Sequence, residues 1–96
     1  MSADEPGGTV CTIVLSPGAR RALTETLPSV AAFAAWEFIT GPLAVRPRVV
    51  GVPLRDPFDR LWRARRGEYR VRYRTDEANQ RVIVLDVDHR RDVYRP

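Results

Sequence analysis

The sequence predicts an α+β fold, in the order β-α-α-β-β-β, with an N-terminal helical hairpin packed on one face of a four-stranded sheet. Three observations lead to this fold class. A β-branched apolar run comes first, two helix-forming stretches bounded by prolines follow it, and three strand-like runs separated by turns come last. The last three strands are expected to form an antiparallel meander, and only the first strand makes the sheet mixed.

Length and composition allow one domain. The chain has 96 residues, of which 44% are hydrophobic, and this is enough for one modest core. Residues 1–8 are small and acidic and contain glycine and proline, so they are expected to form a flexible leader. Residues 9–96 are expected to form the single domain.

The first strand and the first helix meet at Ser16. Residues 9–15 are β-branched and apolar, as in a strand that is buried on at least one face. Serine is a favoured N-cap and proline is tolerated at the first helical position, so a helix is expected over residues 17–26, before Pro28. Its inward-facing residues are expected to be Ala19, Ala22 and Leu23.

A second helix and an extended connection complete the first half of the chain. The helix is expected to begin at Ser29 and to stop at Gly41-Pro42. Trp36 on this helix, like Trp62 further along, is interpreted as a residue of the core or its rim. Residues 42–57 contain four prolines and are therefore expected to be extended.

Three strands are expected in the second half. Residues 60–65, 69–75 and 81–88 are strand-like, and Gly67-Glu68 and the polar residues 76–80 separate them as turns. The last run is almost continuously apolar, which is typical of a strand with neighbours on both sides. It is therefore placed in the middle of the sheet.

The charge of the chain points to an anionic partner. The net charge is +4, and all 16 cationic side chains are arginines. Because the guanidinium group binds phosphate through two hydrogen bonds and stacks on bases, this composition favours a nucleic acid. A GC-rich coding sequence also favours arginine over lysine, and that alternative stays open.

Several other classes of protein are excluded by composition. The longest apolar stretch, residues 30–39, contains Glu37 and is too short to cross a bilayer, so membrane insertion is excluded. The single cysteine, Cys11, cannot form an internal disulfide, which favours the cytoplasm. With one histidine and one cysteine, no metal site and no cofactor are expected.

Arginines are expected to gather on one face of the sheet. Alternate residues of a strand share a face, so Arg70, Arg72 and Arg74 point the same way. The preceding strand adds Arg63 and Arg65, and the hairpin register can bring one of them beside Arg70. The pattern predicts a basic groove, while an ordinary solvated sheet face is the alternative.

The C-terminal residues form a second candidate cluster. The central strand leads directly into residues 89–94, which contain the only histidine, two arginines and a tyrosine. These polar side chains are expected to converge at one edge of the sheet. The alternative is that His89 is an ordinary surface residue.

Two segments together resemble RelE-type toxins of bacterial toxin-antitoxin systems: residues 61–73, which read LWRARRGEYRVRY, and residues 87–94, which read VDHRRDVY. The resemblance covers residues 10–95. It implies a RelE-like toxin domain that acts in the cytoplasm as a metal-independent endoribonuclease on mRNA in the ribosomal A site. It also implies a cognate, RelB-like antitoxin that wraps around the toxin in a hetero-oligomer.

By this resemblance, Arg70 is the arginine that stabilises the phosphate, and Leu61 stands where some members carry a catalytic lysine. In such a reaction the 2′-hydroxyl attacks the adjacent phosphorus, and arginine is a poor proton acceptor because its pKa is above about 12. Histidine, with a reference pKa of about 6.5, is the best acid or base available. The expected catalytic residues are Arg63, Arg70, His89, Arg90 and Tyr94, and the expected RNA-binding residues are Arg65, Arg66, Arg72, Arg74 and Arg91.

Two other functions remain open at this point. A ParE-like protein with the same fold would inhibit DNA gyrase and would not cleave RNA. A catalytically weakened toxin, which Leu61 would explain, would act mainly as the antitoxin's partner in regulating their operon.

Overall fold

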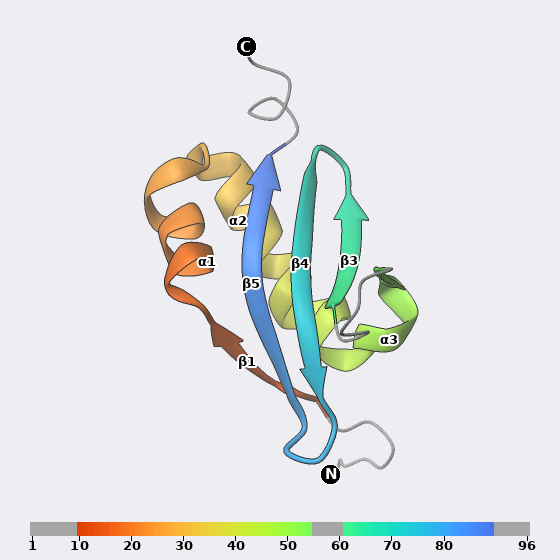
Figure 1. Cartoon of the computed structure of the whole chain (residues 1–96). Helices are drawn as coiled ribbons and strands as arrows, with labels where there is room; N and C mark the ends of the chain where they lie inside the picture. Colours follow the sequence, from red (N-terminus) through yellow and green to blue (C-terminus); the bar gives the residue numbers. More distant parts are fainter. Residues whose placement is uncertain (1–9, 55–60, 90–96) are drawn as a thin grey trace, which may run out of the picture.

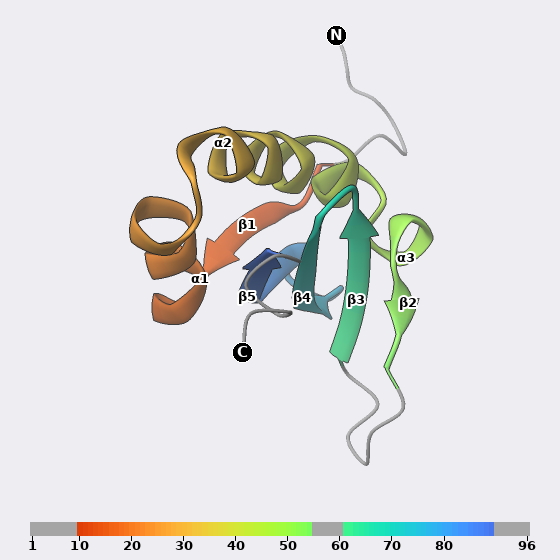
Figure 2. The ribbon, with the colours of Figure 1, turned by 90° about the horizontal axis from the view of Figure 1, so that it is seen from above.

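Two layers make up the part of the chain that the structure, a computed structural model, describes, namely residues 10–54 and 61–89 (Figure 1). Helices cover one face of a sheet, and the view from above shows α2 lying across that face (Figure 2). The predicted leader, residues 1–8, lies outside the described residues. The elements are β1 Thr12–Leu15, α1 Pro17–Arg21, the π-helical turn η1 Ala22–Thr26, α2 Ser29–Phe38, the π-helical turn η2 Ile39–Leu43, α3 Pro47–Val50, β2 Val52–Pro53, β3 Leu61–Arg66, β4 Tyr69–Asp76 and β5 Arg81–His89.

The sheet has five strands in the order β1-β5-β4-β3-β2. β1 runs parallel to β5, and all other neighbours are antiparallel. The α+β class, the mixed first strand and the central position of the last strand are confirmed. The prediction of four strands was wrong because β2 adds a fifth at the edge beside β3, where Pro53 is tolerated since an edge strand does not need every N–H group.

Ser16 joins the first helix to the centre of the sheet. Its Oγ accepts a hydrogen bond from the Ala19 backbone N–H at 3.1 Å, as an N-cap should, and donates one to the Leu85 carbonyl of β5 at 2.8 Å. The helical backbone then continues through η1 to Thr26, and Ala19 and Ala22 are buried. The predicted cap and helix and the inward positions of Ala19 and Ala22 are therefore confirmed, while Leu23 is half-buried and packs against the core.

The second helical segment is longer than predicted. Helical backbone continues through Gly41-Pro42, because η2 forms a wider π turn that accommodates a proline without an N–H group. The Pro42 carbonyl then accepts a hydrogen bond from the Arg46 N–H at 2.9 Å. Since α3 follows as well, the expected extended connection over residues 42–57 was wrong for its first part, up to Val50, while Val52–Pro53 is extended. No helix among the described residues has the length and apolar character needed to cross a membrane.

The core lies between the helical layer and strands β4 and β5. Tyr69 and Tyr73 of β4 point into it, and both side chains are anchored by their hydroxyl groups. Tyr69 donates to the Ala34 carbonyl of α2 at 3.1 Å, and Tyr73 donates to the Pro47 carbonyl of α3 at 2.5 Å. Burial raises the pKa of Tyr73 to about 12, so this hydroxyl keeps its proton and stays a donor.

A β-bulge interrupts the pairing of β4 with β5. Arg72 pairs with Asp86 and Tyr73 pairs with Val84, so Leu85 is the extra residue on β5. Its carbonyl is the one that accepts the Ser16 hydroxyl. Because of the bulge, Val82, Val84 and Val87 are all buried although their spacing does not follow a strict alternation.

Gly51, at the end of α3, allows a close approach between α3 and the sheet. A Cβ atom at this position would collide with the Tyr73 hydroxyl and would lie 2.9 Å from the Arg63 carbonyl oxygen. The backbone of Gly51 is extended, so glycine is needed here for space. This contact holds α3 and β2 against β3.

Gly51→Ala is therefore expected to lower the free energy of unfolding by about 1–3 kcal/mol, measured by urea denaturation, because the methyl group overpacks the Tyr73 contact. Gly41→Ala is the matched control, since nothing lies within 4 Å of a Cβ there. Adding Tyr73→Phe to Gly51→Ala should cost less than the two single changes summed. Equal losses for the two glycine variants would contradict this role of Gly51.

Candidate nucleic-acid interface

Five arginines lie on the sheet face that is turned away from the helices. Tyr69, Val71 and Tyr73 of β4 are buried against the helices, so the alternate residues of that strand point to the other face. The register places two arginines of β3 on the same face. We call this set the arginine face; it consists of Arg63, Arg65, Arg70, Arg72 and Arg74.

Like charges stand opposite each other on this face. Arg63 pairs with Arg72, and Arg65 pairs with Arg70. Directly opposed side chains of antiparallel strands have Cβ atoms about 4.5–5.5 Å apart, and like charges at that distance destabilise the pair. The hairpin of β3 and β4 therefore concentrates four guanidinium groups at a cost in stability.

Leu61 also belongs to this side of β3, because it pairs with Arg74. It is half-buried. At the position where the family resemblance implies a lysine in some members, the arginine face thus ends in an apolar side chain.

Two carboxylates border the arginine face on β5, and the sequence pattern did not lead us to predict them as part of the site. Asp86 binds Arg72, with 2.6 Å between Oδ2 and Nη2. Asp88 pairs in register with Arg70. The alternation of Asp86 and Asp88 with the buried Val87 was the signal that could have placed them here.

His89 is not brought together with the arginine face. It pairs with Tyr69, on the side of the sheet that the helices cover, and is only 8% exposed. Its Nε2 atom lies 3.6 Å from Oε1 of Glu68. Because Asp88 occupies the arginine face, the next residue of the strand must point to the other face.

Arg66 also lies apart from the arginine face. Its guanidinium carbon is 5.3 Å from the centre of the Phe38 ring on α2, a cation–π contact on the helical side. Arg66 counteracts the rise that burial causes in the pKa of Tyr69. The expected RNA contact of Arg66 is therefore not supported by its position.

Three of the expected site residues, Arg90, Arg91 and Tyr94, lie outside the described residues. The structure therefore assembles the expected Arg63, Arg65, Arg70, Arg72 and Arg74 on one surface and places Arg66 and His89 elsewhere. Within the described part of the chain, no three His, Cys, Asp or Glu residues are grouped as a metal site requires.

The two tryptophans have different environments. Trp62 is half-buried and stacks on Tyr73 with 6.4 Å between ring centres, and the guanidinium carbon of Arg48 lies 5.8 Å from the centre of the Trp62 ring. The interpretation of Trp62 as a core-rim residue is confirmed. Trp36 is 42% exposed, and its interpretation as a residue of the core or its rim was wrong because this side chain borders an open groove.

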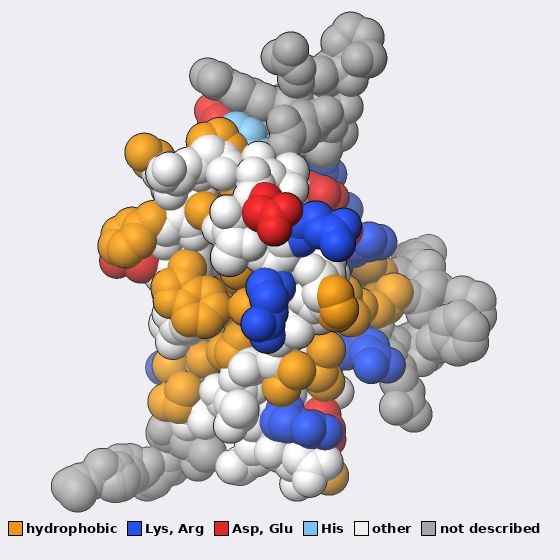
Figure 3. All heavy atoms as spheres, turned by 90° about the vertical axis from the view of Figure 1, so that its left-hand side faces the viewer, with side chains coloured by type: hydrophobic (Ala, Val, Ile, Leu, Met, Phe, Trp, Pro, Cys, Tyr) orange, Lys and Arg blue, Asp and Glu red, His pale blue; other side chains and the backbone are white. Residues whose placement is uncertain are grey.

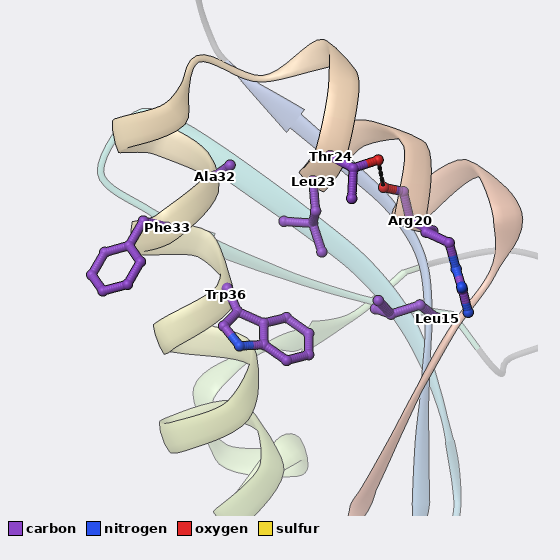
Figure 4. A pocket seen from close by; sticks show the side chains of 7 residues that line it. All are labelled: Leu15, Arg20, Leu23, Thr24, Ala32, Phe33 and Trp36. Carbon is purple, nitrogen blue, oxygen red and sulfur yellow. Dashed lines mark hydrogen bonds between the residues drawn. The ribbon is translucent and has the colours of Figure 1, made fainter.

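The side of α2 that bears Trp36 faces an open apolar groove on the helical layer. The groove has a volume of about 360 Å³ and lies between α2 and the α1–η1 helix (Figure 4). Apolar side chains gather on this side of the molecule, with arginines among them (Figure 3). The residues lining the apolar groove are Leu15, Arg20, Leu23, Thr24, Ala32, Phe33 and Trp36.

Comparison with known proteins relates the chain to bacterial toxins. The family model of the ParE toxin of the type II toxin-antitoxin system parDE matches residues 13–94. The chain is 43% identical over 84 residues to toxin RelG of Mycobacterium tuberculosis, covering 88% of this chain and 95% of RelG. It is 37% identical over 95 residues to toxin RelE of the same organism, covering 99% of this chain and 93% of RelE.

Two solved structures share the architecture. The toxin-antitoxin complex RelBE2 of M. tuberculosis contains a chain that is 41% identical, with a TM-score of 0.80 over 84% of this chain and 92% of that one. The archaeal RelE-RelB complex of Pyrococcus horikoshii OT3 matches with a TM-score of 0.62 over 85% of this chain and 97% of that one. At 24% identity, the archaeal match shows the fold alone.

If the opposed arginines cost stability, Arg65→Gln should raise the free energy of unfolding at low salt by up to about 1 kcal/mol. The gain should shrink at 1 M salt, where the screening length falls to about 3 Å. Urea denaturation at both salt concentrations measures this. The matched control is Arg21→Gln, which removes the same charge from an exposed position on α1 and should bring no comparable gain.

Proposed function

The chain belongs to the RelE/ParE family of toxins of type II toxin-antitoxin systems, and from this premise we propose that it is a ribosome-dependent endoribonuclease that cleaves mRNA in the A site. The observation that carries this proposal is the arginine face, where four guanidinium groups are held together on two strands in spite of their repulsion. An anionic backbone lying on these groups would remove that repulsion. The relatives at 37–43% identity are both named toxins of the Rel type.

The proposed reaction needs no metal or cofactor. The ribose 2′-oxygen forms a bond to the adjacent phosphorus, its proton passes to a base, and the bond to the 5′-oxygen breaks as that oxygen takes up a proton. Arg63 and Arg70 stabilise the negative charge that develops on the phosphate oxygens. They do not exchange protons, because a guanidinium stays charged.

Proton transfer is assigned to the end of β5. On the family resemblance, Arg90 and Tyr94 are proposed to complete the site, with Tyr94 as the group that can relay a proton. His89, the expected acid or base, is buried on the side of the sheet opposite Arg63 and Arg70. Because His89 lies behind the sheet, 3.6 Å from Glu68, most of the rate is ascribed to charge stabilisation and to positioning on the ribosome. Arg65, Arg72, Arg74 and Arg91 are proposed to bind the RNA.

The proposed partner is a cognate, RelB-like antitoxin in a hetero-oligomer. The RelBE2 structure of M. tuberculosis, which contains a chain 41% identical to this one, is a toxin-antitoxin complex. An acidic segment suits the arginine face, and the apolar groove suits one face of an amphipathic helix. Because Arg20 lines the groove and Arg21 lies beside it, acidic residues flanking the apolar side of that helix would complete the match.

A second candidate function is inhibition of DNA gyrase, which the match to the ParE family model favours. The fold is common to both activities and does not separate them. Inducing the chain while mapping 5′ ends of transcripts and following DNA breaks decides between them. New mRNA ends that depend on translation support the nuclease, DNA breaks support the gyrase inhibitor, and neither would leave a weakened toxin that mainly binds its antitoxin.

Arg70→Ala is expected to slow cleavage of ribosome-bound message by about 100-fold to 1,000-fold, since it removes one group that stabilises the transition state. Arg90→Ala should also slow it. Codon-resolved cleavage of a message stalled on ribosomes measures both effects. Arg21→Ala is the control, because it removes an arginine from the helical layer; wild-type rates for Arg70→Ala and Arg90→Ala would reject the nuclease.

Phe33→Ser is expected to weaken antitoxin binding at least tenfold, because an aromatic side chain that fills a groove is often a main source of affinity. Phe33 is 65% exposed, so the free protein should keep its stability. Val30→Ser is the matched control, since Val30 is 83% exposed on the same helix and does not line the groove. Calorimetric titration with the antitoxin compares the two, and equal affinities would exclude the groove.

A further inference from the structure

Six charged side chains form a small grid on the sheet face. Each row crosses three strands, with one arginine from β3, one from β4 and one aspartate from β5. The two rows are Arg65–Arg70–Asp88 and Arg63–Arg72–Asp86. The sign of the charge therefore changes between β4 and β5, within one strand spacing of about 4.8 Å.

Some arginines of the sheet are paired with a carboxylate, and others are not. On β5, Arg81 is bound by Asp76 at 2.8 Å, and on β4, Arg72 is bound by Asp86 at 2.6 Å. In the described part of the chain, Arg63 and Arg65 on β3 have no carboxylate within ion-pair distance. Among the described residues, Arg70 and Arg74 of β4 form no ion pair either, so the cations available to a new anion lie on β3 and β4 and away from β5.

Asp88 is not explained as a stabilising partner. It stands beside Arg70 in register, yet the two do not form an ion pair within 4 Å. It is exposed, so it acts on its surroundings through its charge. On the other side of β5, the neighbouring strand β1 has the sequence TIVL and carries no charge. The two aspartates are therefore the edge of the cationic area.

We propose that Asp86 and Asp88 determine the path of RNA across the sheet: they repel phosphate groups from β5 and confine the backbone to the surface of Arg63, Arg65 and Arg70. This inference rests on the proposed function, since it concerns how the same face holds its substrate. Asp86 has a second effect, because it occupies Arg72. Arg72 therefore contributes less to RNA binding than Arg63, its neighbour across the strands.

The test measures binding of a short single-stranded RNA at several salt concentrations, with the full chain and without ribosomes. Asp86→Asn and Asp88→Asn are each expected to tighten binding about threefold to tenfold at low salt and, where a new phosphate contact forms, to steepen the dependence of log Kd on log salt by about 0.7. Glu25→Gln is the matched control, because it removes the same charge from an exposed position in the helical layer. It should change affinity much less.

The role of Arg72 has its own comparison. Arg72→Gln should weaken RNA binding less than Arg63→Gln does, and Asp86→Asn should bring little gain once Arg72 is replaced. Because the Arg72–Asp86 pair is half-exposed, these variants are expected to fold, and their thermal unfolding checks this.

The outcomes separate the inference from the proposed function. If the two aspartate variants leave RNA binding unchanged, or if Glu25→Gln improves it equally, the proposed role of Asp86 and Asp88 in limiting the RNA path is overturned. The proposed function is not affected by that result. If neither the wild type nor any variant binds RNA, the role of the two aspartates fails, and cleavage of ribosome-bound message decides the proposed function separately. Tighter, more salt-dependent binding confined to the two aspartate variants supports the path.

Discussion

One strand determines which side of the sheet is packed and which side is charged. β4 alternates Tyr69, Val71 and Tyr73 with three arginines, and the helices cover the first set. Two of the buried side chains are tyrosines whose hydroxyl groups bond to the helical layer, so a shift of register by one residue would bury guanidinium groups and expose the core. The arginine face therefore exists because the opposite face must be buried.

The helical layer leaves its outer surface free for a different kind of contact. α2 is apolar almost all round, and only part of it reaches the sheet, so Phe33 and Trp36 border a groove that no described residue fills. The molecule thus has a cationic surface on one layer and an apolar surface on the other. These two surfaces match the proposed contacts, with RNA on the arginine face and the apolar side of an antitoxin helix in the groove.

Much of the fold could be predicted where local chemistry decides it. Ser16-Pro17 predicted the start of the first helix. Gly67, with a positive φ of 59°, allows the turn between the second and third of the predicted strands. Gly41-Pro42 wrongly predicted the end of the second helix, because the burial of Ile39 and Leu43 outweighed the local preference of these two residues for ending a helix. β2 is too short to show alternation, so no pattern revealed it.

The candidate site was predicted less completely, for a related reason. Alternation along β4 correctly grouped its arginines, but the same reasoning applied to β5 would have turned His89 away from them and brought Asp86 and Asp88 beside them. In β2, β3 and α2, which side is buried depends on tertiary packing. Trp36 and Phe33 could not be placed, since an all-apolar helix carries no mark of its buried face.

The bulge at Leu85 limits how the length of this chain can vary. The residues before it and after it reach the same faces of the sheet only because one residue is left out of the pairing. Loss of a single residue there would exchange the two faces for one half of the strand, with valines entering water or aspartates entering the core. Insertions and deletions accepted by evolution should therefore collect in the turn at residues 77–80, where the chain is exposed and no face is assigned.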